Sequence, residues 1–377
     1  MKAPLIFFFS LILFTSQAQY TVRLVVTDIA TRKYDDVYVT GNFNNWNPKD
    51  ENYKLKPFGG NRKSLVIKDI APGTYAFKFT RGSLDKIETT ADGRDINDRV
   101  LEVNGDISLD FTIPGWKDEY PETPKRYTAS PQVRLLDTAF NMPQLNRKRR
   151  IWIYLPKGYA ASSKIYPVLY MNDGQNLFNE KTSTAGEWGV DECLDSLQTK
   201  LNKECIVVGI DHGGDKRNTE YNPYDDLQNG KGEGKLYIDF LATTLKPFID
   251  SKYRTKKGPE NTYIAGSQLG GLISLYAVMQ YPNVFGSAGV FSPVFYTSPF
   301  IYSDAENFVT PGMPKIYLYA GGKETTTAVS DLQRMGDILQ KKPKYNIRRV
   351  ISPLGQPNET YWRQEFAVFY KWMMSFE

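Results

Sequence analysis

Five residues in the second half of the chain have the spacing of a nucleophile motif but lack the nucleophile. Residues 266–270 match the pattern G-x-S-x-G except at the central position, which holds Gln268. In this motif a strand turns sharply into a helix and presents the central side chain at the edge of the sheet. A carboxamide has no ionisable nucleophilic atom, so Gln268 cannot form an acyl-enzyme by the serine route. The pattern predicts a hydrolase turn without its attacking atom.

The motif belongs to a wider set of segments that resemble a known family. These segments are residues 170–178, 208–211, 220–223, 263–271 and 355–362. Together they resemble the putative-esterase branch of the α/β-hydrolases, which includes enterochelin, feruloyl and acetyl-xylan esterases and mycolyltransferases. The resemblance spans residues 134–376. It implies an α/β fold, an α/β-hydrolase domain with a mostly parallel sheet.

The resemblance also implies where the catalytic residues would stand. The nucleophile slot holds Gln268, and the family's catalytic histidine, which precedes an Asn-Glu pair near the end of the chain, is replaced by Pro357. The acid slot is matched by Glu324, which follows an expected strand at 315–320. Without a histidine, the acid has no base to orient. The resemblance therefore implies a member of the family with no intact Ser–His pair.

Two other residues are candidates to replace the missing pair. His212 is the single histidine of the chain and follows the expected strand 205–211, which in the family's strand order lies two places from the elbow strand. Neighbouring strands are about 4.8 Å apart, so the lateral offset is roughly 10 Å and exceeds hydrogen-bond reach. Ser267 leaves the turn in a different direction from the central residue. We expect neither to restore catalysis and interpret Ser267 as structural.

Family position also implies a pocket. The backbone amide of Leu269 and those around Asp173, Gly174 and Gln175 are expected to form an oxyanion-type cradle that does not need the serine. For the two tryptophans of the set, packing is the alternative to a place in the pocket wall. The side chains expected to line the pocket are Glu187, Trp188, His212, Glu220, Tyr221 and Trp362.

The hydrophobic pattern changes along the chain and predicts two domains. Residues 21–26, 37–40, 64–67 and 74–80 read as short strands between Gly, Asn and Asp turns, which predicts a small immunoglobulin-like β-sandwich over residues 19–115. A proline-bearing linker follows at 116–133. From residue 134 to 377, strands alternate with helical stretches such as 235–253 and 270–281, the pattern of a mostly parallel sheet.

The first domain contains a second resemblance. Residues 39–48 resemble the G-x-F-x-x-W motif of glycogen- and starch-binding sandwich modules, with Trp46 as the tryptophan. The resemblance implies a carbohydrate-binding-module-like domain in which Trp46 stacks on a sugar ring. Packing of Trp46 inside the sandwich is the alternative. Both interpretations stay open at this stage.

Composition limits the classes of partner. The chain of 377 residues is 41% hydrophobic and 24% charged, as in an ordinary globular protein, and its net charge of +5 comes from 47 basic and 42 acidic residues. Its strongest basic run, residues 147–150, is interpreted as a solvated domain-entry loop rather than a nucleic-acid site. No metal ion and no cofactor are expected, and the oligomeric state is left open.

The first residues have the features of an export signal. Lys2 precedes an apolar stretch at 5–14, and Ser16-Gln17-Ala18 fits cleavage after Ala18. The apolar stretch is too short for a membrane span, so a secreted or periplasmic protein is expected. In an oxidising compartment Cys193 and Cys205 could form a disulfide, and two thiols that pack side by side are the alternative.

Three functional hypotheses remain. The first is a catalytically degenerate carbohydrate-ester esterase that keeps a pocket and binds a carbohydrate or a carbohydrate ester. The second is a live hydrolase that acts on polysaccharide-linked acetyl or feruloyl esters with non-standard residues. The third is a structural or partner-binding subunit.

Overall fold

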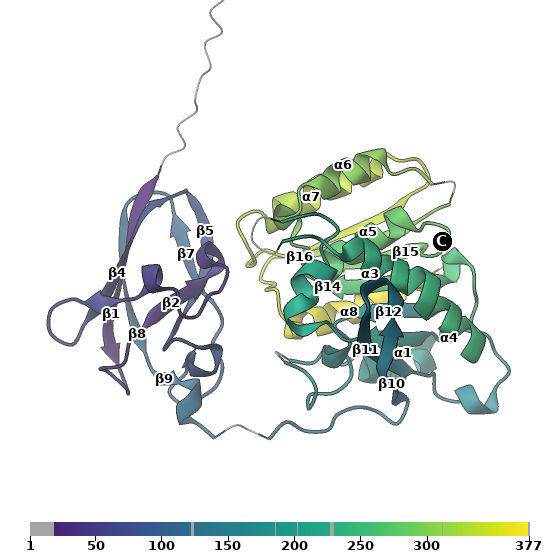
Figure 1. The fold of residues 1–377 in the computed structure, drawn as a ribbon, viewed down its shortest axis with the longest axis horizontal. Helices are drawn as coiled ribbons and strands as arrows, with labels where there is room; N and C mark the ends of the chain where they lie inside the picture. Colours follow the sequence, from purple (N-terminus) through teal and green to yellow (C-terminus); the bar gives the residue numbers. More distant parts are fainter. Residues whose placement is uncertain are drawn as a thin grey trace, which may run out of the picture. The chain divides into compact units, whose positions relative to one another are not determined.

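The computed structural model describes residues 19–121, 124–184, 186–201, 203–226, 230–310 and 312–375. The expected export signal, residues 1–18, lies outside them. The chain divides between Thr123 and Pro124 into two compact units, each with its own core (Figure 1). In the described part of the chain, no helix is long and apolar enough to cross a bilayer.

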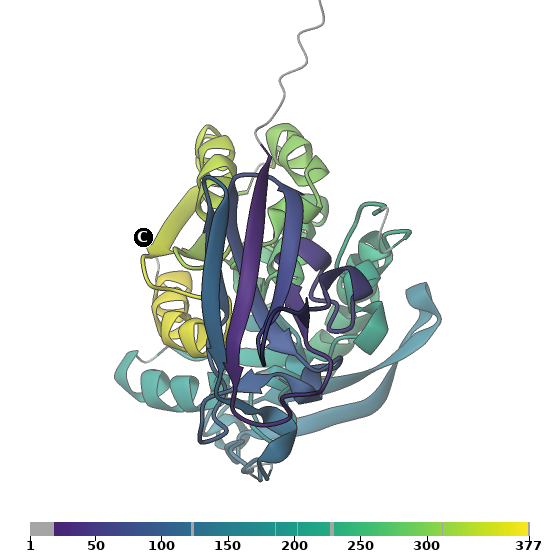
Figure 2. The same cartoon turned by 90° about the vertical axis from the view of Figure 1, so that its left-hand side faces the viewer.

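The first unit is built of short strands in small sheets. The longest strand, β1 (Tyr20–Ile29), pairs antiparallel with β4 (Lys63–Ile70) and parallel with β8 (Ile107–Ile113), so it lies in the middle of its sheet (Figure 2). The other strands are β2 (Tyr38–Gly41), β3 (Lys56–Pro57), β5 (Gly73–Thr80), β6 (Glu88–Thr89), β7 (Arg99–Val103) and β9 (Gly115–Trp116).

The core of the first unit extends past the expected end of the sandwich. Trp116 is fully buried in it, its indole N–H donates to the carbonyl of Thr31 at 3.2 Å, and the guanidinium of Arg81 lies over its ring. Burial of so large a side chain removes much apolar surface from water. Of the residues 116–133, which the sequence analysis assigned to a linker, 116–121 therefore belong to this unit and 124–133 to the second.

The second unit contains an eight-stranded sheet in the order β10-β11-β13-β12-β14-β15-β16-β17. β10 and β11 are antiparallel to their neighbours and the other strands are parallel, which confirms the expected α/β fold. The strands are β10 (Val133–Met142), β11 (Arg147–Tyr154), β12 (Val168–Asn172), β13 (Ile206–Ile210), β14 (Thr262–Ser267), β15 (Ser287–Phe291), β16 (Lys315–Gly321) and β17 (Asn346–Ser352).

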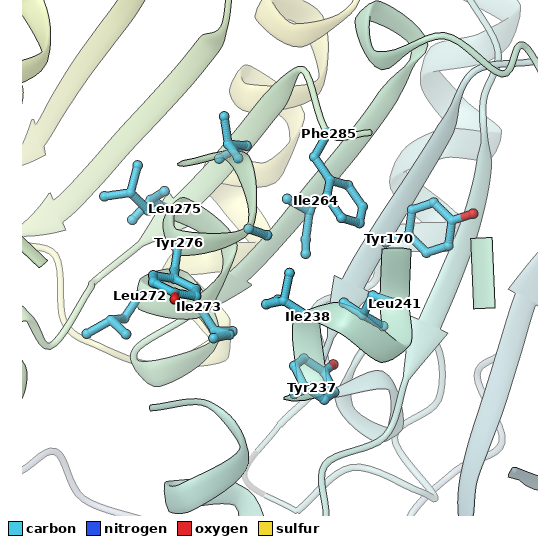
Figure 3. Close-up of a cluster of buried hydrophobic side chains, with 14 of the residues drawn as sticks. Tyr170, Tyr237, Ile238, Leu241, Ile264, Leu272, Ile273, Leu275, Tyr276 and Phe285 are labelled. Carbon is cyan, nitrogen blue, oxygen red and sulfur yellow. The ribbon is translucent and has the colours of Figure 1, made fainter. Parts of the chain in front are cut away.

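Side chains alternate between the two faces of this sheet along each strand, so both faces present apolar side chains. Helices cover both faces. On one face Ile264 of β14 packs in a cluster with Ile238 and Leu272 (Figure 3), and on the other Ala265 packs with α1 and α8. The helices are α1 (Val190–Leu201), α2 (Arg217–Glu220), α3 (Gly234–Phe240), α4 (Lys246–Lys252), α5 (Leu269–Gln280), α6 (Phe300–Asn307), α7 (Ala328–Gln340) and α8 (Glu359–Met373).

The expected helical stretches are confirmed in place. The stretch 270–281 is α5, and the stretch 235–253 is α3 and α4 joined by a π-helical segment at Leu241–Leu245. Cys193 and Cys205 are both free thiols.

The interpretation of residues 147–150 as a solvated loop was wrong. They begin strand β11, and Arg149 is buried with its guanidinium nitrogen Nη2 at 2.6 Å from Oε2 of Glu220. Arg147 reaches Oε1 of the same carboxylate at 2.8 Å. Burying a carboxylate is costly unless partners of opposite charge are beside it. Arg147 and Arg149 therefore pair with an interior acid.

Candidate functional site

The elbow predicted from the sequence is present with its strained geometry. β14 ends at Ser267, α5 begins at Leu269, and Gln268 between them has φ 53° and ψ −119°. Its backbone N–H donates to the carbonyl of Phe291 at 2.9 Å, which ties the turn to β15. Non-glycine residues rarely adopt a positive φ, and such strain persists only where the surroundings impose it. The turn therefore keeps the geometry of a nucleophile elbow around a carboxamide.

Close packing under the turn explains the glycines of the motif. A Cβ on Gly266 would lie 2.8 Å from the backbone of Gly270 and 3.1 Å from Cβ of Asn172. Asn172, at the end of β12, donates to the carbonyl of Gly270 at 3.2 Å and to the hydroxyl of Ser274 at 3.0 Å. A side chain on Gly266 would collide with the backbone of Gly270, and one on Gly270 would press on Cβ of Asn172 at 3.3 Å, so the strand–helix crossing is close.

An ion pair that the sequence analysis missed lies beside the elbow. Arg217 donates through Nε and Nη2 to the two oxygens of Asp173 at 2.8 and 2.9 Å, and through Nη2 to the carbonyl of Ser267 at 3.4 Å. Burial lowers the pKa of the Arg217 guanidinium, but the adjacent Asp173 carboxylate raises it more, so the net direction is upward and the arginine stays charged. Nothing in the pattern around Arg217 distinguished it from a surface residue.

The expected oxyanion cradle is only partly free. Asp173 has a left-handed backbone, with φ 57°, and its N–H donates to the hydroxyl of Tyr221 at 3.2 Å. Gln175 is buried, its Oε1 accepts from the N–H of His212 at 3.2 Å, and its Nε2 has no partner among the described residues. The loop after β12 therefore keeps a donor in the carboxamide of Gln175, while the amide of Asp173 already has an acceptor.

One oxygen of the acid in the acid slot is hydrogen-bonded without a histidine. Oε1 of Glu324 accepts from the hydroxyl of Ser292 at 2.6 Å and from the N–H of Gly321 at 2.5 Å. Ser292 in turn accepts from the indole N–H of Trp362 at 2.8 Å. Burial raises the pKa of Glu324 to about 7, while its two donors act in the opposite direction. The carboxyl group is thus held in the interior through Oε1, to which both donors bond.

The histidine slot lies on a loop packed against the acid loop. Pro357 stands just before α8, whose N-cap is Asn358, with its side-chain oxygen accepting from the N–H of Tyr361 at 3.4 Å. A Cβ on Gly321 would lie 2.2 Å from the carbonyl oxygen of Gly355, so the two loops touch. The slots filled by Glu324 and Pro357 are therefore on neighbouring loops.

A second buried acid follows the histidine slot. Glu359 opens α8 and accepts from the side-chain amide of Asn176 at 3.4 Å. Burial raises the pKa of Glu359 to about 7, with Asp173 raising it further and Arg217 lowering it. Electrostatic coupling to both members of the ion pair places Glu359 in the same polar group.

His212 follows a strand that lies two places from the elbow strand, which confirms the predicted order β13-β12-β14. Its Nδ1 accepts from the N–H of Gly214 at 2.9 Å, and burial lowers its pKa. An imidazole with Nδ1 used as an acceptor keeps its proton on Nε2. His212 is held by its own loop.

The remaining predicted pocket residues have interior contacts. Trp188 and Trp362 are buried and stacked on each other, with ring centroids 5.5 Å apart and planes at 29°. Tyr221 is fully buried under Arg217, with the guanidinium 5.2 Å from its ring centroid. Glu220 is fully buried between arginines, so we assign it a structural role.

Glu187 precedes α1 and forms an acidic group with two residues of the first turn of that helix. It is buried and accepts from the hydroxyl of Thr128 at 3.0 Å. Its carboxylate and those of Asp191 and Glu192 lie within 4.8 Å of one another. Burial, followed by smaller effects that include the nearby Glu192, raises the pKa of Asp191 to about 8.

In the first unit, Trp46 lies on a tight loop outside the core. Asn45 and Trp46 both have positive φ, 54° and 57°, and the N–H of Trp46 donates to the carbonyl of Gly41 at 2.8 Å. Trp46 is half-buried, whereas Phe43 of the same motif stacks on Tyr53 at 5.0 Å. The loop therefore holds the indole partly exposed.

Comparison with known proteins identifies the second unit. Residues 142–371 match the model of the family described as Putative esterase. The structure of the enterobactin esterase FES from Shigella flexneri, in the presence of enterobactin, superimposes with a TM-score of 0.55 at 16% identity and covers 90% of this chain and 87% of that one.

Two curated proteins share part of the sequence. The alpha-amylase of Niallia circulans is 36% identical over 84 residues, which are 22% of this chain and 6% of the amylase. The endo-1,4-beta-xylanase/feruloyl esterase of Xylanibacter ruminicola is 26% identical over 144 residues, which are 37% of this chain and 19% of that enzyme. The chain thus spans a small part of each of these two relatives.

We predict that Gln268→Gly stabilises the protein by about 1 kcal/mol, because glycine adopts the positive φ of the elbow without strain. The hydrogen bond from residue 268 to Phe291 is kept, since it uses the backbone. The matched control is Gln280→Gly at the exposed end of α5, which should cost about 0.5–1 kcal/mol by helix propensity. Chemical denaturation measures both. Destabilisation by Gln268→Gly would mean that side-chain contacts of Gln268 outweigh the strain.

A second prediction concerns pH. Since the folded-state pKa of Glu324 lies near 7 and its ordinary value is 4.5, the unfolded chain releases this proton first as pH rises. Folding stability should fall between about pH 4.5 and 7, by about 1.4 kcal/mol for each pKa unit at most. Glu324→Gln keeps the acceptor oxygen and removes this loss, so the variant should exceed wild type in stability at pH 8 and match it near pH 5.

Denaturation curves at the two pH values check the Glu324 prediction. Glu306→Gln, at an exposed position on α6, is the control and should follow wild type at both. The pKa of Glu359 is also raised to about 7, so its ionisation lowers folding stability over the same pH range. The Glu324→Gln variant therefore keeps part of the pH dependence of stability. Lower stability of Glu324→Gln than of wild type at pH 8 would contradict a raised pKa of Glu324 in the folded state.

Proposed function

Because the chain belongs to the Putative esterase family, we propose that it is a non-hydrolytic relative of feruloyl and siderophore esterases that binds a carbohydrate or a carbohydrate ester. The observation that carries this proposal is the elbow at Gln268, which keeps a strained backbone while presenting a side chain that cannot attack an ester. Strain of about 1–3 kcal/mol at one residue is typical of a functional site. A carboxamide offers one acceptor and two donors, which suit the hydroxyl and carbonyl groups of a sugar ester.

The surroundings of Gln268 support binding more than chemistry. The Asp173–Arg217 ion pair and Glu359 add charge and hydrogen-bonding capacity beside the elbow. In the acid slot, Oε1 of Glu324 accepts from Ser292 and Gly321, and Pro357 stands where the resemblance implies the histidine. A site with donors and acceptors in place, and without a nucleophile or base, recognises a polar ligand and does not turn it over.

Support for a carbohydrate ligand comes from parts of the chain other than the elbow. The chain shares sequence with an alpha-amylase and with an endo-1,4-beta-xylanase/feruloyl esterase. Trp46 of the first unit is held partly exposed on a tight loop, as a sugar-stacking platform requires. We further propose that the protein is exported through residues 1–18 and meets polysaccharide outside the cytoplasm.

One observation favours the second candidate, a live hydrolase with non-standard residues. Glu359 has a pKa of about 7, which suits a general base at neutral pH. Such an enzyme would have to activate water rather than a serine. Hydrolysis that disappears in Glu359→Gln would support this alternative and overturn the non-hydrolytic proposal.

We predict that the purified protein shows no serine-type esterase activity toward an aryl acetate or a feruloyl ester. Loss of triad residues in a serine hydrolase still leaves about 10³-fold acceleration over water, so the comparison is with turnover above that background. Labelling by a fluorophosphonate probe checks for an activated serine. Robust turnover together with labelling of one serine would contradict the proposal.

A fourth prediction is that Gln268→Ser combined with Pro357→His restores measurable hydrolysis, whereas each single change does not. The loops of the acid and histidine slots touch, so the restored histidine would stand near Glu324. Serine needs a base and histidine needs a nucleophile, so the two gains are non-additive. Replacing Pro357 also frees φ, which limits the rescue through loop mobility.

Outcomes of the rescue experiment separate the candidates. Activity in Gln268→Ser alone would identify another base within reach, His212 or Glu359. A folded double variant without activity, as judged by circular dichroism, would show a remodelled pocket and favour a partner-binding subunit.

The last prediction of this section concerns Trp46. Stacking a sugar on an indole is worth about 1–2 kcal/mol, so Trp46→Ala should remove weak retardation of the full chain in starch, glycogen or xylan gels. Tyr34→Ala, at a tyrosine of the same unit that is 93% exposed, is the matched aromatic control and should migrate as wild type does. Unretarded wild type in every gel would assign Trp46 to packing.

A further inference from the structure

We propose that the esterase-like unit binds a hard divalent cation, Ca²⁺ in preference to Mg²⁺, between Glu187, Asp191 and Glu192. One carboxylate oxygen from each residue lies within 4.8 Å of the others. Glu187 comes from the loop before α1, and the other two belong to the first turn of that helix. The inference is independent of the function proposed for the elbow.

Acidic residues at a helix N-terminus are common, because they complement the helix dipole. The second observation is the state of Asp191. This residue is fully buried; its Oδ2 accepts from the N–H of Ser130 at 2.6 Å, while its buried Oδ1 has no donor in the described part of the chain other than a proton shared with the facing Glu192 carboxylate. Two buried carboxylates that face each other without a donor are costly, and a cation between them can take the place of the shared proton.

Two more oxygens at the same place lack partners. Oε2 of Glu192 and the hydroxyl of Ser130 are both buried and unpaired among the described residues. The other oxygen of Glu192 is 3.8 Å from Arg363. Carboxylate oxygens from the first turn of α1 and a hydroxyl from the segment bound to Asp191 are the oxygen ligands that a hard cation takes.

Protein groups near the cluster compensate little of its charge. Arg363 is the nearest described cation, at 4.0 Å from Glu187 and 3.8 Å from Glu192, and its side chain is 46% exposed. Thr128 donates one hydroxyl to Glu187. A ligand set made of oxygens alone favours Ca²⁺ or Mg²⁺ over zinc, and Ca²⁺ tolerates the irregular geometry of such a cluster better than Mg²⁺.

A cation here would stabilise one wall of the candidate site. It would join residues 128–130 to the loop of Glu187 and to α1. Trp188, next to Glu187, stacks on Trp362, whose N–H donates to Ser292 beside the acid slot. Binding would therefore fix the position of the tryptophan pair.

The test uses the full chain, stripped with a chelator and titrated with CaCl₂ or MgCl₂ by calorimetry and by thermal melting. We expect Ca²⁺ to raise the melting temperature by about 5 °C at a hundredfold excess over Kd, and Mg²⁺ to act more weakly. Glu192→Gln and Asp191→Asn should abolish the Ca²⁺-dependent rise. Glu306→Gln, an exposed change of the same chemistry on α6, should leave it unchanged.

The sign of the effect in chelator separates a cation site from a structural cluster. Under the proposal, Glu192→Gln relieves repulsion among uncompensated carboxylates, so the variant matches or exceeds wild type without Ca²⁺ and falls below it with Ca²⁺. If Asp191→Asn does not fold, Glu192→Gln, whose side chain is 39% exposed, still carries the test. If Glu192→Gln is less stable than wild type by the same amount with and without Ca²⁺, the proposal is overturned.

Two further results would overturn it. One is the absence of calorimetric binding to wild type at about 10 mM Ca²⁺, beyond the weakest range of extracellular sites. The other is binding that persists unchanged in both variants. Stabilisation of wild type by acidification alone, with no response to Ca²⁺, would assign the cluster to a shared proton.

Discussion

The close crossing of β14 and α5 constrains the whole esterase-like unit. Two glycines let the strand pass under the helix at contact distance, and Asn172 hydrogen-bonds the carbonyl of Gly270 from the neighbouring strand. The residue between strand and helix then has no choice of backbone, whatever its side chain. This explains how the turn keeps its geometry with a glutamine at its centre: packing below the turn imposes the backbone conformation.

The parts of the site that depend on local pattern could be predicted from the sequence. The elbow frame, the acid loop after β16 and the position of His212 two strands away all follow from the order of strands and short motifs. Arg217 could not be found in this way, because its partner Asp173 is 44 residues distant and only the fold brings them together. Ser292 was missed for the same reason, since the hydroxyl that occupies Glu324 is 32 residues away.

Charge was the least reliable guide in the sequence. A run of four basic residues looks solvated, yet Arg149 is 7% exposed because Glu220, 71 residues later, is buried against it. Sequence-based interpretation assigns charged residues to the surface because isolated charges are costly inside a protein. It cannot recognise pairs that make burial tolerable. In the first unit the same limit applies to Trp116, whose place in the core depends on its hydrogen bond to Thr31.

The stacked tryptophans have a consequence for observing this protein. Two nearly parallel indoles at 5.5 Å couple their electronic transitions, so Trp188 and Trp362 should behave as one chromophore in near-ultraviolet circular dichroism. One indole precedes α1 and the other lies on α8, far apart in the unit's sequence. A spectroscopic signal from the pair reports whether these two segments are docked. The molecule thus carries an intrinsic optical probe beside its acid slot.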